Sequence, residues 1–245
     1  IYPSDGFYTE GLTVPSFYMG KFEVTQAEFE EVMGYNPSLP PLDPNAPVNR
    51  VTWFKAIEYC NRRSLKEGLF PTYRYCVPKP GSLLSHSYGF DPDDWPEGWD
   101  SPDTDYDHIR FTFLFGEFGY HLLTDKEWEF AARGGVETQG FQYSGSDDLG
   151  EVAWHYGNSG AQVHPVGGKA ANELGIYDMS GNVWEWCWDN PYAATRFVRG
   201  GSFLYSDPQC NPGYRIGHPP TYSSGDLGFR VARGVKNTEI YDDDK

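Results

Sequence analysis

The sequence is poor in basic residues. It has 19 Lys and Arg against 35 Asp and Glu, a formal net charge of −16 over 245 residues. Proteins that bind nucleic acid or anionic lipid neutralise phosphates with Lys and Arg, so this balance argues against such partners. No apolar run approaches the roughly 20 residues of a membrane-spanning helix, and the first residues do not resemble a signal peptide. The mature part of an exported protein remains an open interpretation.

Cysteine is also scarce, and no two cysteines form a C-x-x-C pair. The four are Cys60, Cys76, Cys187 and Cys210. This spacing indicates neither a zinc finger nor a dense disulfide scaffold, and it leaves the redox compartment open. The six histidines show no H-x-x-x-H or similar ligand spacing, which argues against a hidden iron or zinc oxidase.

Hydrophobic residues make up 39% of the chain and aromatic residues 17%, enough to bury a sizeable core. Two capping boxes, Thr25–Glu28 and Thr124–Glu127, predict helix starts, with Gly34 and Gly134 placed to end those helices. Apolar residues at helical spacing predict a third helix beginning at Thr52.

Elsewhere the pattern is irregular. Residues 71–119 contain an acidic stretch rich in proline and tryptophan, which we interpret as an ordered insertion. Its carboxylates favour a solvated loop, with a weak Ca²⁺ site as the alternative, although the spacing does not match an EF-hand. Short segments such as 196–198 and 229–231 are typical of strands. The sequence therefore predicts an α+β fold with much irregular backbone, and residues 238–245 as a flexible tail.

Six ordered motifs resemble the formylglycine-generating-enzyme, or sulfatase-modifying factor, family. They are YMGKFEVTQ from Tyr18, PVNRVTW from Pro47, YHLLTDKEWEFAARGG from Tyr120, GIYDMSGNVWEW from Gly175, RGGSF from Arg199 and LGFR from Leu227. The resemblance implies one domain over residues 1–237 with a C-type-lectin-like fold of low regular secondary structure. It also implies that Gly181–Trp186 is core framework with packed tryptophans.

The same resemblance bears on catalysis. The family's oxidase chemistry depends on two cysteines five residues apart that bind copper as a thiolate pair. Here Tyr205 stands at the first position and Cys210 at the second. A phenol does not replace a soft sulfur ligand, so we expect the chain not to be an enzyme. The alternative is a formylglycine-generating-type oxidase with an altered one-cysteine site.

The segment Leu204–Asp226, called here the variable segment, lies between two framework motifs. Its prolines and glycines are compatible with a plain surface loop. Its tyrosines and small polar residues are also the mixture that binding surfaces use. We expect framework strands at Phe197–Phe203 and Leu227–Val231 to fix its ends.

The two framework motifs that flank the segment, RGGSF and LGFR, together with the central cysteine, form the frame of the segment. This frame also resembles that of the variable proteins of diversity-generating retroelements, in which adenines of asparagine codons are rewritten. Such rewriting never gives Lys, Glu, Met, Trp or Gln. By proportion about three residues of the first four types would be expected in this segment, and it contains none. Gln209 is the one disallowed type present, so it would be an unvaried position.

Eight residues are predicted to contact a ligand: Tyr205, Ser206, Tyr214, Ile216, His218, Tyr222, Ser224 and Asp226. If residues 214–218 are extended, Tyr214, Ile216 and His218 share one side, and Arg215 faces inward as a framework residue.

The sequence thus predicts a non-catalytic, ligand-binding display protein at a bacterial surface, anchored by a lipid or exported. Its partner would be a protein or other macromolecule on a host or neighbouring cell, with no nucleic acid involved. A structural paralogue with an inert loop is the third alternative. No cofactor is expected. A structural Ca²⁺ near Asn158 and Asn182 is left open, since each is as easily a turn residue.

Overall fold

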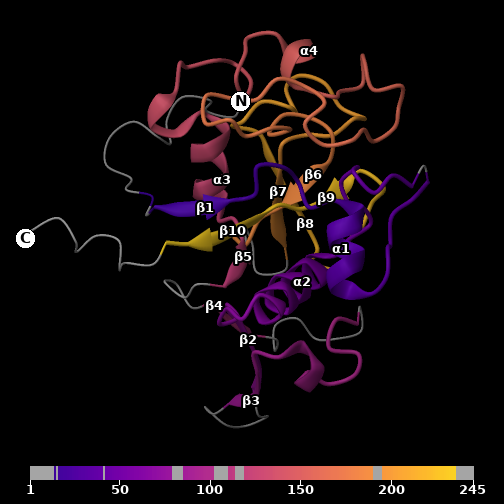
Figure 1. Cartoon of the computed structure of the whole chain (residues 1–245), viewed down its shortest axis with the longest axis vertical. Coiled ribbons are helices and arrows are strands. Elements are labelled where there is room, and N and C mark those ends of the chain that lie inside the picture. Colours follow the sequence, from indigo (N-terminus) through magenta and orange to yellow (C-terminus); the bar gives the residue numbers. More distant parts are fainter. Residues whose placement is uncertain are drawn as a thin grey trace, which may run out of the picture.

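A computed structural model describes residues 14, 16–40, 42–78, 85–101, 110–113, 119–189 and 195–235 (Figure 1). The predicted tail at 238–245 and the end of the acidic stretch, residues 102–107, lie outside these residues. The fold is mixed α+β, with few helices and three small sheets. Among the described residues, no helix combines the length and apolar character needed to cross a bilayer.

The three predicted helices are confirmed. They are α1 (Gln26–Met33), α2 (Trp53–Lys66) and α3 (Asp125–Ala132). Thr25 and Thr124 each accept a hydrogen bond from the third helical N–H, and a glutamate returns the bond, as the capping-box pattern predicts. Gly34 ends α1 in the left-handed conformation, at φ 79°. Three one-turn elements are η1 (Pro92–Asp94), η2 (Gly135–Glu137) and α4 (Leu149–Val152).

The strands form three sheets, two of them antiparallel and the third mixed. One sheet has the order β1 (Phe17–Met19), β10 (Val231–Gly234), β5 (Tyr120–Leu122). The predicted insertion contributes a small sheet of its own, in the order β3 (Ser85–Gly89), β2 (Tyr73–Pro78), β4 (Arg110–Phe113). Figure 1 shows this sheet projecting beyond α2.

The third sheet positions the site. Its order is β8 (Arg215–His218), β7 (Arg196–Arg199), β6 (Trp184–Trp186), β9 (Leu227–Gly228), and β9 runs parallel to β6. The two predicted framework strands are shorter than expected. Positive φ angles at Gly200 (93°) and Gly201 (74°) turn the chain and end β7 well before Phe203. The second predicted strand is divided between β9 and β10.

The core joins these elements through buried aromatic rings and enclosed ion pairs. The indole N–H of Trp53 donates to the carbonyl of Cys187 at 3.0 Å, and that of Trp186 to the carbonyl of Val51 at 2.9 Å. Arg230 is fully buried and pairs with Glu185 at 2.8 Å. Gly181–Trp186 is core framework, as the resemblance implied, because all six of its residues are buried.

Candidate ligand-binding site

The variable segment begins at a close backbone contact. A side chain at Gly201 would place its Cβ 2.7 Å from Cys210 Sγ and 3.0 Å from the Cys210 Cα. Only glycine fits this approach, because no real Cβ tolerates such distances and φ is also positive here. The RGGSF motif therefore turns the chain directly beneath Cys210.

A buried arginine fastens the same turn to α3. The Arg199 side chain has no exposed surface; its Nε donates to Asp125 Oδ1 at 2.7 Å and its Nη2 to Glu129 Oε2 at 2.9 Å. Its Nη1 donates to the Pro212 carbonyl at 2.8 Å. This guanidinium thus links α3 to the main chain of the variable segment, and its positive charge is paired with two carboxylates.

Strand β8 gives the segment an extended piece with two distinct sides. Ile216 lies opposite Val198 of β7 and is 39% exposed. Arg215 instead forms an ion pair with Asp125, and its guanidinium lies 4.5 Å from the Phe197 ring centroid. The expected alternation is present, and Arg215 is a framework residue.

Main-chain hydrogen bonds join the rest of the segment to the frame. Ser224 O accepts from Arg50 N–H at 2.9 Å, and Pro220 O accepts from Trp53 N–H at 3.0 Å. Tyr205 O accepts from Tyr156 N–H at 2.9 Å. None of these three bonds uses a side chain of the segment, so these three anchors do not depend on its side-chain chemistry.

Six of the eight predicted contact residues line one cavity of about 110 Å³, called here the aromatic cavity. Its lining is Trp184, Val198, Tyr205, Gln209, Tyr214, Ile216, His218, Tyr222, Asp226 and Leu227. Trp184, Val198, Gln209 and Leu227 were not predicted as contacts. Trp184 and Leu227 belong to motifs interpreted as core, and each is both buried and part of the cavity wall.

A second cavity, of about 370 Å³, adjoins the first. Its lining is Leu39, Pro40, Asn49, Ala161, Gln162, Val163, Phe203, Leu204, Ser224, Gly225 and Asp226. Asp226 is the residue that both cavities share, and the predicted Ser224 lines only this one. Ser206 lines neither cavity; its carbonyl accepts from Cys210 N–H at 3.2 Å.

Asp226, one of the eight predicted contact residues, is a buried side chain and not an exposed one. It is only 6% exposed, because Ser202 Oγ donates to its Oδ2 at 2.8 Å and Ser224 Oγ donates to its Oδ1. It sits between the two cavities as a buried acceptor. By contrast, Tyr205 and Tyr222 are each 41% exposed.

Cys210 is enclosed. It has no exposed surface, and burial raises the pKa of its thiol to about 12. Its Sγ lies 3.8 Å from the Tyr205 carbonyl oxygen, a weak contact for a thiol. A protonated, buried thiol beside a tyrosine is not a dithiolate donor set, so these residues do not fit a copper centre of the family's type.

Neither asparagine considered for Ca²⁺ has a free side-chain amide. Asn158 accepts from the His155 N–H and donates to the Ala153 carbonyl. Asn182 donates to Glu23 and accepts from the His164 N–H. Across the described ranges, no group of three His, Cys, Asp or Glu side chains is close enough together to hold a metal ion.

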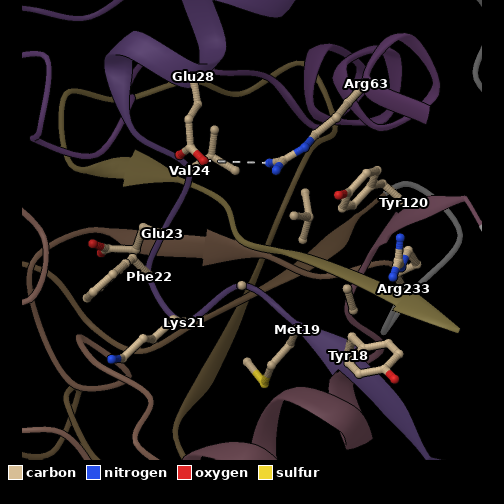
Figure 2. A pocket seen from close by; sticks show the side chains of 13 residues that line it. Tyr18, Met19, Lys21, Phe22, Glu23, Val24, Glu28, Arg63, Tyr120 and Arg233 are labelled. Carbon is tan, nitrogen blue, oxygen red and sulfur yellow. Dashed lines mark ion pairs between the residues drawn. The ribbon is translucent and has the colours of Figure 1, made fainter. Parts of the chain in front are cut away.

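A separate cavity of about 330 Å³ lies beside β1 and β10, and no residue of the variable segment lines it. Figure 2 shows Glu28 and Arg63 facing each other across its upper side, 3.7 Å apart. The Arg63 guanidinium also lies 4.4 Å from the Tyr120 ring centroid, and that of Arg233 lies 5.4 Å from the Tyr18 ring centroid. Its most prominent charges are thus engaged with neighbours, and it is not the candidate site.

Comparison with known proteins agrees with this architecture. The family model described as sulfatase-modifying factor enzyme 1-like domain matches residues 7–235. A Paenibacillus barcinonensis protein named chaperone protein LppX is 39% identical over 91% of this chain and 82% of its own length. The formylglycine-generating enzyme of Streptomyces coelicolor is 36% identical, but the match spans only 49% of this chain and 48% of that enzyme.

Among solved structures, Treponema denticola variable protein 1 superposes with a TM-score of 0.75 at 33% identity. The alignment covers 89% of this chain and 84% of that one. This likeness is consistent with the narrower resemblance to retroelement variable proteins.

Proposed function

The chain belongs to the sulfatase-modifying factor family, and from that membership we propose that it is a ligand-binding member without formylglycine-generating activity. One observation carries the proposal. The two positions that would hold a reactive cysteine pair are Tyr205, whose ring lines the aromatic cavity, and Cys210, a buried thiol whose pKa is raised to about 12. Nucleophilic and metal-binding sulfur must be a thiolate, which this environment disfavours.

The arrangement of the variable segment supports a binding role. The frame holds it by main-chain bonds and through Arg199, while three large apolar side chains, Tyr205, Ile216 and Tyr222, remain substantially exposed around the aromatic cavity. Exposed aromatic groups with a few convergent polar groups are typical of recognition surfaces. The likeness to a variable protein of the same fold points the same way.

In this proposal the segment is the diversified part of a display protein at the bacterial surface or exported from the cell. The ligand is then a protein or other macromolecule on a host or neighbouring cell. The large acidic excess of the chain disfavours nucleic acid as that ligand.

An assay for formylglycine separates this proposal from the one-cysteine oxidase. A cysteine-containing substrate peptide is incubated with the protein, and its mass is followed, with an active formylglycine-generating enzyme as the positive control. We expect no conversion above the no-enzyme background, with or without added copper. Conversion that disappears in Cys210→Ser would overturn the proposal.

Diversification has its own test. The gene is sequenced from several isolates, and we expect substitutions confined to codons 204–226, at positions where adenine replacement explains them. Differences spread evenly over the chain would instead favour a structural paralogue with an inert loop.

A further inference from the structure

The aromatic cavity contains a single carboxylate and no strong base. None of its lining residues is Lys or Arg, and neither is any residue that lines the second cavity. The one ring base is His218, whose pKa is lowered by burial, with Asp226 acting in the opposite direction. The lowered pKa favours the neutral imidazole at pH 7.

Asp226 has no cationic partner within the part of the chain that the structure describes. No Lys or Arg nitrogen there lies within 4 Å of it. Its two acceptor contacts come from the hydroxyls of Ser202 and Ser224, which orient the carboxylate but carry no positive charge. Asp226 is thus a carboxyl group, 94% buried between two cavities, whose described partners are neutral hydroxyls, so an incoming cation would be its first charge partner.

Aromatic rings line the same cavity as this carboxylate. The Trp184 ring lies edge-on to Tyr205, with centroids 5.5 Å apart, and 6.0 Å from the Tyr214 ring. The Tyr222 ring stacks on His218 at 4.3 Å with an interplanar angle of 12°. The electron-rich faces of Trp and Tyr attract cations, and cages of such rings bind methylated and quaternary ammonium groups.

The size of the cavity limits what can enter. Its volume of about 110 Å³ is well below the roughly 300–1,000 Å³ of sites that enclose drug-sized ligands. It suits a single small headgroup, with the rest of the ligand lying outside or over the second cavity.

We propose that the aromatic cavity binds an organic ammonium group. Asp226 supplies the opposite charge, and the rings of Trp184, Tyr205, Tyr214 and Tyr222 supply the walls. The inference rests on the proposed function, because it names the chemistry that the same surface recognises. Two sources carry this chemistry: a lysine side chain, plain or methylated, on a protein ligand, and a small molecule with a quaternary ammonium headgroup.

Four probes test the proposal: choline, its neutral isostere 3,3-dimethylbutan-1-ol, and Nα-acetyl-lysine methylamide with and without three Nε-methyl groups. Binding to the full chain is followed by NMR, using the indole N–H signal of Trp184. We expect choline or a lysine probe to bind at least about tenfold more tightly than the neutral isostere, because the charged contact is lost in the latter. Preference for the lysine probes would indicate a protein ligand, and preference for choline a small molecule.

Variants identify the contributing residues. Asp226→Asn keeps an oxygen acceptor for Ser202 and is expected to remove most of the tenfold advantage. Asp94→Asn makes the same chemical change at an exposed site outside the cavity and is expected to leave the tenfold preference for the ammonium probe unchanged. Tyr222→Leu removes an exposed ring and should weaken ammonium binding about two- to fivefold.

The proposal fails if no ammonium probe shifts the Trp184 signal, if the isostere binds as tightly as choline, or if both Asp226→Asn and Tyr222→Leu bind as the unmodified protein does. Any of these results would leave the absence of formylglycine generation and the diversification of the segment standing, since those are tested by turnover and by gene sequences.

Discussion

Asp178 is a buried carboxyl in an acidic neighbourhood. It is 2% exposed, its Oδ2 accepts from Gly167 N–H at 2.7 Å, and its Oδ1 has no hydrogen-bond partner among the described residues. Burial raises its pKa to about 6, with a smaller opposing effect from Arg230. Burial raises the pKa of Glu23 in the same region, helped by the charges of Asp178 and Glu185. The core therefore holds more acid than Arg230 alone neutralises.

This imbalance predicts a pH-dependent stability. A folded-state pKa above the unfolded value of about 3.9 means that the folded protein binds the proton more tightly, so the stabilisation is fully present below about pH 4 and is lost as the pH rises from there through about 6. Asp178→Asn removes this loss, which amounts to as much as about 3 kcal/mol. Urea unfolding at pH 4.5 and pH 7 measures the larger part of this loss, about 2 kcal/mol. An identical change with pH in the variant and the unmodified protein would contradict the assignment, and Asp94→Asn serves as the surface control.

At the scale of elements, the turn after β7 decides where the variable segment starts. Gly200 and Gly201 both have positive φ, and Gly201 lies against Cys210. Strand β9, after the segment, is held parallel to β6, with Leu227 opposite Trp184. The two ends of the segment are thus fixed within one sheet, on either side of the cavity.

A matched pair of glycine substitutions tests the close approach. Gly201 and Gly140 both have a φ of 74°, but a Cβ at Gly140 would meet nothing within 4 Å. Alanine at either site carries about 1–2 kcal/mol of left-handed strain. Gly201→Ala also forces the backbone of Cys210 aside, so we expect it to lower the free energy of unfolding by at least about 2 kcal/mol more than Gly140→Ala. If chemical denaturation shows that both variants lose the same free energy of unfolding, the close approach to Cys210 does not restrict the residue at position 201.

Local signals made the helices predictable, whereas long-range contacts determined the rest. The capping boxes at Thr25 and Thr124 are complete within four residues, so the sequence alone specified them. The burial of Asp226 depends on Ser202, 24 positions away, and no periodicity indicates it. The second cavity joins residues near 39, 162 and 204, which become neighbours only in the folded chain. Tyr205 and Tyr222 were placed among the contact residues from the composition of the segment and its resemblance to variable proteins, and both are 41% exposed.

At the scale of the whole molecule, the buried arginines that hold the fold together are separate from the exposed side chains proposed to contact a ligand. Arg199 and Arg230 are both fully buried, and their carboxylate partners lie on α3 and β6. Tyr205, Ile216 and Tyr222 are 39–41% exposed. The first set holds the fold together, and the second set faces outward from it.

Substitutions at the two sets should therefore differ in cost. Replacing Tyr205, Ile216 and Tyr222 together by serine is expected to lower the free energy of unfolding by no more than about 1.5 kcal/mol, as exposed positions usually do. Arg199→Ala removes the buried cation between Asp125 and Glu129, leaving them only the partly exposed Arg215 and Arg133, and should cost about 3 kcal/mol. Urea titration measures the free energy of unfolding of both variants. A triple variant as unstable as Arg199→Ala would mean that the tyrosines are structural.

The hydrogen bonds from Arg50 and Trp53 to the carbonyls of Ser224 and Pro220 have one further consequence. Every amino acid supplies the same carbonyl group, so these anchors are indifferent to the side chains at the residues that accept them. The protein is accordingly suited to serve as a scaffold for synthetic libraries, in which the positions around the aromatic cavity are randomised and new specificities are selected without redesigning the support beneath them.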